Sequence, residues 1–390
     1  MTNHHLSSFF CPTRIHMGDD ACAKLPDILA SYQHPNTLVV VDPALIDGAY
    51  HARIRKILES ANVNTVTFSE IEPEPSAHTV EKIEALARQA NVKLVLAIGG
   101  GSTIDAGKAV AILLTNGGRI HDYEGIEKFS IPPLPVIAIP TTAGTGSEVS
   151  GSCVISDTDK GLKMSIRHAS LNPARHAILD PKALVTLPAS VAAHAGIDAF
   201  VHALESFISR LSNPVTDAIN LQAISTIAAN LRPFVRDRSN LESSLLMLTG
   251  STLAGMTFGQ TGLGNVHCMA RFVGAFYHLS HGLSNALCLT EVCRFNRPAA
   301  PEKFAQIAHA MGCQTSGLSV HDAGLMAIDA IEALCRDVGI PDSLRQAGVD
   351  DLRFEEMASL CVQANYNRWN PRETSKADFI QLFQSAYGPR

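Results

Sequence analysis

Three histidines and an arginine lie in one apolar segment, GNVHCMARFVGAFYHLSHG, residues 264–282. His267 and His281 are fourteen residues apart (281 minus 267). On one straight helix they would share a face but lie about 21 Å apart, whereas two ligands of one metal ion lie at most about 4 Å apart. Both can bind the same cation only if the chain reverses between them, and Gly274 and residues 280–282 are the expected breaks.

A second pair of polar side chains lies upstream in GIDAFVHALES, residues 196–206. Asp198 and His202 have the i, i+4 spacing and therefore share one face of a helix. Together with His267 and His281 they could bind a divalent cation through three imidazoles and one carboxylate, and such a cation acts as a Lewis acid. The alternative is that the four side chains each have separate hydrogen-bond partners.

A glycine-rich segment, GGGSTIDAGKA (residues 99–109), follows a strand-like run and begins a helical pattern. Backbone N–H groups at such a junction can bind a phosphate. The segment does not match the Rossmann fingerprint, because Ile104 replaces a glycine. It does not match the P-loop either, because Ser102 and Ala109 stand at required positions. A tight turn without a ligand is the alternative.

A second polar loop, PTTAGTGSEVS (residues 140–150), follows another strand-like run. Two such loops at the carboxyl ends of parallel strands form the crevice in which open α/β sheets bind ligands. Asp42, which ends the run TLVVVD, could accept a hydrogen bond from a ribose hydroxyl and repel a 2′-phosphate. That favours NAD over NADP, although a solvated aspartate at a strand end is the alternative.

Two kinds of pattern divide the chain. Apolar, β-branched runs at residues 37–42, 93–101 and 134–142 alternate with amphipathic helical stretches, which predicts a parallel sheet covered by helices on both faces. From about residue 185 onward the periodicity is helical throughout. We therefore expect an α/β dinucleotide-binding domain over residues 1–185 and an all-α metal-binding domain over residues 186–390.

Composition limits the classes of partner. The formal net charge of −6 argues against a nucleic-acid or anionic membrane surface, and no window approaches the roughly 18 uncharged apolar residues of a membrane span. The N-terminal residues lack the pattern of a signal peptide, and the nine cysteines are scattered without a CxxC pair. We expect a cytoplasmic protein with reduced thiols that binds a small molecule and neither nucleic acid nor membrane.

The chain resembles the iron-containing (group III) alcohol dehydrogenases over nearly its whole length. The resemblance rests on the order and spacing of GGGSTIDAGK, PTTAGTGSEVS, ILDP, GIDAFVHALE, GLGNVHCMARFVGAFYHLSHGLSNA and NPRETSKADFIQLF. It implies a Rossmann-like, dehydroquinate synthase-like α/β domain joined to an all-helical metal domain, and a homodimer. It also implies hydride transfer between NAD(H) and a small alcohol or aldehyde, with a metal that polarises the carbonyl group.

The resemblance also assigns site residues. It implies an iron centre with the ligands Asp198, His202, His267 and His281, a set that would also suit Zn²⁺ or another divalent transition metal. Glu205 matches the acidic residue of the family's HAxE motif and is expected to orient a ligand histidine. The residues implied at the cofactor are Asp42, Gly99, Gly100, Gly101, Ser102, Asp105, Thr141, Thr142, Thr145, Ser147 and Lys163.

The main departure from the family pattern is Arg271, which stands where a second histidine is usual. Arginine cannot act as a general base at neutral pH, but it binds carboxylate, sulfonate or phosphonate groups well. We therefore expect His267, Arg271 and His281 to act at the reacting substrate, and the substrate to carry an anionic group. A structural ion pair between Arg271 and a nearby carboxylate such as Glu205 is the alternative. His194, which replaces the usual threonine, is a candidate for the lost proton relay.

Other enzymes with this two-domain plan are the competing interpretations. The segment NVHCMARFVGAFYHLSHG follows the alcohol dehydrogenase pattern and argues against dehydroquinate synthase and glycerol dehydrogenase. Maleylacetate reductases are nearer relatives, but we expect them to lack the full ligand set. A metal-binding or scaffold protein without catalysis would leave both glycine loops without a role.

Overall fold

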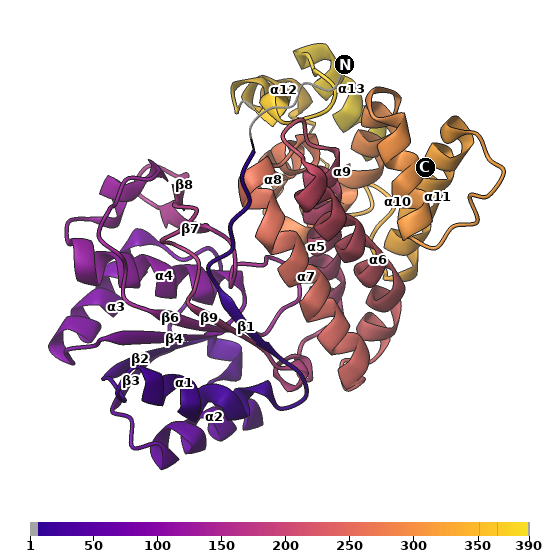
Figure 1. Ribbon diagram of the computed structural model, residues 1–390. Coiled ribbons are helices and arrows are strands. Elements are labelled where there is room, and N and C mark those ends of the chain that lie inside the picture. The colour runs from indigo at the N-terminus through magenta and orange to yellow at the C-terminus, as the bar shows by residue number, and fades with distance from the viewer. Residues whose placement is uncertain (1–6, 351, 365, 389–390) are drawn as a thin grey trace. The chain divides into compact units, whose positions relative to one another are not determined.

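The apolar runs of the N-terminal part form a six-stranded sheet in which all neighbouring strands are parallel (Figure 1). The computed structural model describes residues 7–350, 352–364 and 366–388. The sheet has the strand order β1-β9-β6-β4-β2-β3. The strands are β1 (Arg14–Met17), β2 (Thr37–Val41), β3 (Thr65–Phe68), β4 (Leu94–Gly99), β6 (Val136–Pro140) and β9 (His176–Leu179). The expected parallel sheet is confirmed.

Helices cover both faces of this sheet, with α3 and α4 on one side and α1 and α2 on the other in Figure 1. These helices are α1 (Leu25–Ser31), α2 (Ala49–Ser60), α3 (Ala77–Gln89) and α4 (Gly101–Asn116). The strands β2, β4, β6 and β9 are buried along their whole length. Successive side chains of a strand point to opposite faces, so both faces need apolar residues, which explains the continuous apolar runs.

A small second sheet was not expected from the sequence. It consists of β5 (Gly125–Ile126), β8 (Leu162–Arg167) and β7 (Ser152–Asp157), in that order. β7 and β8 form an antiparallel pair, and the turn between them contains Gly161 with a φ of 63°. Because β7 contacts α4, this sheet lies next to the helix that begins at the glycine-rich segment.

The chain from Pro188 onward forms a compact helical unit, distinct from the unit Phe10–Leu187, and residues 7–9 group with it. Its described part contains no strand, as expected. The α helices are α5 (Ala189–Ile208), α6 (Pro214–Arg236), α7 (Leu241–Thr261), α8 (Asn265–Tyr277), α9 (His281–Asn296), α10 (Pro301–Ala310), α11 (Val320–Asp337), α12 (Phe354–Gln363) and α13 (Lys376–Tyr387). Short 3₁₀ helices in the two units are η1 (Ala21–Lys24), η2 (Pro43–Leu45), η3 (Ile120–Tyr123), η4 (Pro181–Leu184), η5 (Arg297–Ala299) and η6 (Tyr366–Arg368).

The helix α5 is buried on all sides from Gly196 to its end. Every residue from 196 to 208 is buried, and α6, α7 and α9 pack around it. A Cβ at Gly196 would come within 2.2 Å of Leu231 Cδ1 on α6, so the close approach of these helices depends on glycine. Polar side chains on a helix in this position need partners inside the protein.

No helix in the described part of the chain combines the length and the apolar character that crossing a membrane requires.

Candidate metal centre and dinucleotide loops

Asp198 and His202 lie one turn apart on the buried helix α5. Both side chains are buried, and Asp198 Oδ2 lies 3.9 Å from His202 Nδ1. The His202 ring also stacks on Phe258, with the ring centroids 4.5 Å apart. The predicted i, i+4 pair therefore projects into the interior of the helical unit.

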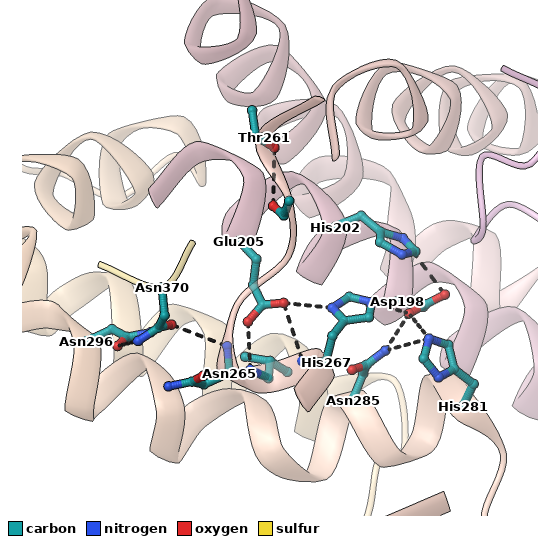
Figure 2. A network of polar contacts seen from close by, with 12 residues as sticks. Asp198, His202, Glu205, Thr261, Asn265, His267, His281, Asn285, Asn296 and Asn370 are labelled. Carbon is teal, nitrogen blue, oxygen red and sulfur yellow. Dashed lines mark hydrogen bonds and ion pairs between the residues drawn. The ribbon is translucent and has the colours of Figure 1, made fainter. Parts of the chain in front are cut away.

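His267 and His281 meet Asp198 because the chain reverses between them. α8 ends at Tyr277, His278 adopts a left-handed conformation with a φ of 55°, and His281 begins α9. The Nε2 atoms of His267 and His281 both lie 3.6 Å from Asp198 Oδ1, and the His202 and His267 ring centroids are 4.6 Å apart. Figure 2 shows the three rings grouped around the carboxylate.

The expected reversal occurs, but Gly274 is not one of its breaks. Gly274 lies within α8, and a Cβ there would come within 3.2 Å of the Leu279 carbonyl oxygen. Glycine at this position therefore permits the chain to pack back closely against the helix. The left-handed residue that ends α8 is His278, which is exposed.

The buried ring of His267 fits a metal centre. Its Nδ1 lies 2.7 Å from Glu205 Oε2, and a carboxylate only accepts, so Nδ1 carries the proton. Nε2 then presents a lone pair toward Asp198, is buried, and has no hydrogen-bond partner among the described residues. A lone pair and a carboxylate oxygen that face each other require a cation or a proton between them. Three imidazoles and one carboxylate suit a divalent transition metal.

Glu205 holds His267 and the first turn of α8 together. The side chain is buried, and Oε1 accepts from the Val266 N–H at 2.6 Å. Oε2 accepts from His267 Nδ1 at 2.7 Å and lies 3.4 Å from the His267 backbone nitrogen. A Cβ at Gly264 would come within 3.0 Å of Glu205 Oε1. Glycine thus lets a carboxylate from α5 reach the amino end of α8, where N–H groups lack intrahelical partners.

Three buried asparagines extend this network to the C-terminal segment, and sequence reasoning missed them (Figure 2). Asn370 Oδ1 accepts from the Asn265 N–H at 3.3 Å and from Asn296 Nδ2 at 2.9 Å. Asn370 Nδ2 donates in return to Asn296 Oδ1 at 2.8 Å. Asn370 lies in the segment NPRETSK, which was noted for the family resemblance without a role. The network holds Asn265, which precedes Val266, and thereby supports the hydrogen bond from the Val266 N–H to Glu205.

Arg271 lies one turn after His267 on α8 and is partly buried. Its guanidinium carbon lies 5.9 Å from the Phe272 ring centroid. The alternative expectation of an ion pair with Glu205 is wrong, because no carboxylate among the described residues pairs with Arg271, and Glu205 is bonded to α8. His194 Nδ1 lies 3.2 Å from Ser280 Oγ, and burial lowers the pKa of His194.

The two glycine loops of the N-terminal unit contact each other. Gly99 ends β4, Gly100 is the N-cap of α4, and Gly101 and Ser102 begin that helix. A Cβ at Gly100 would come within 3.3 Å of the Thr142 side chain, and one at Gly101 within 2.7 Å of Thr145 Cγ2. The structure therefore brings the two predicted loops together, with glycine where the threonines approach the turn.

The Thr141 N–H donates to the Gly99 carbonyl at 3.0 Å, which aligns the two loops at the ends of β4 and β6. Asp42 follows β2, and its Oδ1 accepts from the Ala44 N–H at 2.9 Å. This aspartate therefore caps a short helix with one oxygen. Lys163 Nζ, on β8, contacts Glu74 Oε1 at 2.5 Å.

The buried Lys108 and the partly buried Asp105 bind the backbone and side chains of the second loop and of the first residues of β7. Lys108 Nζ donates to the carbonyls of Ser147, Ser150 and Ser152 at 2.8, 3.0 and 2.6 Å. Asp105 accepts from Ser147 Oγ and from the Val154 N–H. Burial lowers the pKa of Lys108, and Asp105 opposes that shift. One oxygen of Asp105 thus contacts the second loop and the other contacts β7. The sequence prediction placed Asp105 at the cofactor and did not include these contacts.

A second group of possible ligands lies elsewhere in this unit. Side-chain atoms of Asp20, Cys22 and Asp180 lie within 4.8 Å of one another. Asp20 already pairs with Arg53, and Asp180 accepts from the backbone N–H groups of Cys22 and Lys182. Burial and the neighbouring carboxylates raise the pKa of the Cys22 thiol to about 12. The thiol is therefore protonated at neutral pH, and a metal would have to displace this proton to bind here.

The first prediction concerns pH. Burial lowers the pKa of His267, but Asp198 and Glu205 outweigh burial and raise it to about 9 in the protein without metal, against about 6.5 for an unfolded histidine. A pKa that is raised on folding stabilises the fold below the unfolded value, and this stabilisation is lost as pH rises through the folded value. The melting temperature of the metal-free protein should therefore fall between about pH 6.5 and 9 because of His267.

The metal-loaded protein should lack this loss, because the cation replaces the proton. His267→Asn, which takes up no proton, should flatten the metal-free profile. A metal-free profile of His267→Asn that follows the wild type would contradict the prediction.

The second prediction concerns Glu205. Glu205→Gln keeps the shape of the side chain but removes the charge that orients His267 and caps α8. Metal affinity, measured by competition with a chelator, should fall about 10- to 100-fold. Glu302→Gln changes an exposed acid in the first turn of α10 and serves as the control. Equal affinities for the two variants would show that Glu205 does not support the metal centre.

The third prediction concerns Lys108. Lys108→Met leaves three carbonyls and Asp105 without their cation, and each orphaned buried group costs about 1–3 kcal/mol. We expect a loss of unfolding free energy of about 3 kcal/mol or more, measured by the urea midpoint, together with weaker dinucleotide binding. Lys82→Met, at an exposed position of α3, is the matched control. An unchanged midpoint for Lys108→Met would refute this role.

Comparison with known proteins matches both units of the chain to one enzyme family. The family model for "iron-containing alcohol dehydrogenase" matches residues 12–181, and that for "Fe-containing alcohol dehydrogenase family, C-terminal" matches residues 192–387. The chain is 38% identical to 1,3-propanediol dehydrogenase from Citrobacter freundii over 97% of each chain. These matches do not support the alternative of a maleylacetate reductase-like enzyme or another dehydroquinate synthase-fold activity.

Solved structures of related enzymes have the same fold as this chain. The crystal structure of a 1,3-propanediol oxidoreductase superposes with a TM-score of 0.95 at 36% identity, covering 98% of this chain and 100% of the other. Sulfoacetaldehyde reductase from Bifidobacterium kashiwanohense, solved in complex with NAD⁺, gives a TM-score of 0.89 at 25% identity, with 99% and 100% coverage. This chain therefore belongs to the iron-containing alcohol dehydrogenase family.

Proposed function

We propose that this protein is an NAD(H)- and iron-dependent alcohol dehydrogenase that interconverts a small alcohol and its aldehyde. The observation that carries the proposal is the convergence of Asp198, His202, His267 and His281 at one site of the helical unit. The two mutually packed glycine loops of the other unit support dinucleotide binding.

The protein's own residues position the reactants. When bound, the metal supplies a Lewis acid for the substrate oxygen, and the nicotinamide supplies or accepts the hydride. Asp198 and the three imidazoles are the proposed ligands, and Glu205 fixes the tautomer and ring orientation of His267. The side chain of His281 is 46% exposed, which gives a small molecule access to this edge of the site.

The cofactor residues are proposed from the loops. Residues 99–102 lie at the junction of β4 and α4, where backbone N–H groups can bind a pyrophosphate. Asp42 uses one oxygen to cap η2, and its other oxygen remains to accept from a ribose hydroxyl, which favours NAD over NADP. Thr141, Thr142, Thr145 and Ser147 supply the polar edge of the second loop.

The finer proposal concerns the substrate. The relatives differ, since one is named for a neutral diol and another for an anionic aldehyde. Arg271 favours an anionic substrate, because this partly buried residue lies one turn after His267 on α8, and no carboxylate among the described residues pairs with its guanidinium. An arginine in this state gains most from a ligand that brings a carboxylate, sulfonate or phosphonate.

We further propose a cytoplasmic homodimer. All nine cysteines lie in the described part of the chain, and none forms a disulfide, which is consistent with a reducing compartment. The proposal of a dimer rests on the family resemblance.

The fourth prediction tests the substrate class with the iron-reconstituted protein. Oxidation of NADH would be followed at 340 nm with two sets of aldehydes, one neutral (acetaldehyde, propionaldehyde, lactaldehyde) and one anionic (succinic semialdehyde, sulfoacetaldehyde, phosphonoacetaldehyde). The anionic set should have the higher kcat/KM. Arg271→Met should reduce kcat/KM for the anionic set by about 10- to 100-fold, as expected for a lost charge-assisted hydrogen bond, with little change for the neutral set.

The neutral aldehydes serve as the control for general damage to the site. An equal reduction for both sets would make Arg271 a structural residue. A complete lack of NADH oxidation by the reconstituted wild type with every aldehyde would contradict the proposed activity itself.

A further inference from the structure

Glu74 has an unusual backbone conformation for its residue type. It lies between β3 and α3 with a φ of 59°, in the left-handed region that residues other than glycine seldom adopt. It also precedes Pro75, and the residue before a proline is normally extended. Such a conformation persists only where neighbouring groups hold it, and it is frequent at functional sites.

Three hydrogen bonds hold this turn. The Glu74 N–H donates to Ser102 Oγ at 3.2 Å. Ser156, on β7, donates from Oγ to the Glu74 carbonyl at 3.1 Å and from its backbone N–H to the Pro75 carbonyl at 2.8 Å. Because Ser102 is the second residue of α4, the turn is fixed directly beside the glycine junction that is expected to bind the pyrophosphate.

The conformation of the turn brings the Glu74 carboxylate to Lys163. Oε1 of Glu74 lies 2.5 Å from Lys163 Nζ, and the two side chains are 52% and 34% exposed. Lys163 is one of the residues expected at the cofactor. Its ammonium group therefore has an anionic partner within the protein, and the backbone of that partner is bonded to Ser102 at the glycine junction.

We propose that Glu74 sets the affinity for NAD(H) by competing with the cofactor phosphates for Lys163. This inference rests on the proposed function, since it assumes that the junction of β4 and α4 binds a dinucleotide. In the free protein, Glu74 holds the ammonium group. When the cofactor binds, the carboxylate repels the phosphates and shares Lys163 with them. The ion pair is exposed, so the competition lowers the affinity about two- to fivefold without abolishing binding.

The fifth prediction follows from this competition. Glu74→Gln keeps the length of the side chain and removes the charge. The Kd for NADH, measured by fluorescence titration of the metal-loaded protein, should fall about two- to fivefold, and the gain should shrink at high salt. Lys163→Met should raise the Kd. In the Lys163→Met background, Glu74→Gln should lose most of its effect, because the two side chains act through one contact.

Glu70→Gln is the matched control. Glu70 is an exposed acid in the same connection between β3 and α3, and it forms no ion pair with the described residues. Glu70→Gln therefore changes the net charge by the same amount as Glu74→Gln but does not release Lys163. If Glu74→Gln binds NADH no more tightly than Glu70→Gln does, the proposal is overturned. If the wild type itself does not bind NADH, the proposed function fails instead.

Discussion

The carboxylate of Glu205 is bonded to two groups that could not otherwise be buried together. The Val266 N–H at the start of α8 needs an acceptor, and so does Nδ1 of His267. One negative charge serves both, in a position where the partial positive charge of a helix N-terminus stabilises it. The geometry of the proposed metal centre depends on this contact, because a proton fixed on Nδ1 leaves Nε2 to face Asp198.

Each unit uses a buried charge to position a loop or helix end. In the helical unit, Glu205 accepts hydrogen bonds from N–H groups at the start of α8. Asn370, which exchanges two hydrogen bonds with Asn296, also accepts from the N–H of Asn265, 105 positions earlier in the sequence. In the other unit, Lys108 collects the carbonyls of the loop after β6. A buried ion is costly unless all its hydrogen bonds are satisfied, so these two residues restrict the backbone around them to few conformations.

The sequence predicted the features that follow from periodicity. It did not predict where a single residue in an unusual backbone conformation ends a helix or forms a turn. The i, i+4 spacing placed Asp198 beside His202, and the distance limit for metal ligands required the reversal before His281. The breaks were expected at Gly274 and at residues 280–282. Ser280 does precede α9, but α8 ends at the left-handed His278 and not at Gly274. Likewise, β1 and β3 are four-residue edge strands with no fully buried position, so no apolar run marks them. The conformation of Glu74 could not be predicted from local sequence either, because three hydrogen bonds to residues distant in the sequence hold this turn.

The proposal that Asp198, His202, His267 and His281 bind one metal ion is central to the proposed function. Anomalous diffraction from crystals of the iron-loaded protein, measured on both sides of the iron absorption edge, tests it most directly. We expect one strong peak about 2.0–2.3 Å from ring nitrogens of His202, His267 and His281 and from an Asp198 oxygen. A peak at Asp20, Cys22 and Asp180 instead, or active crystals with no peak between the three histidines, would contradict the account.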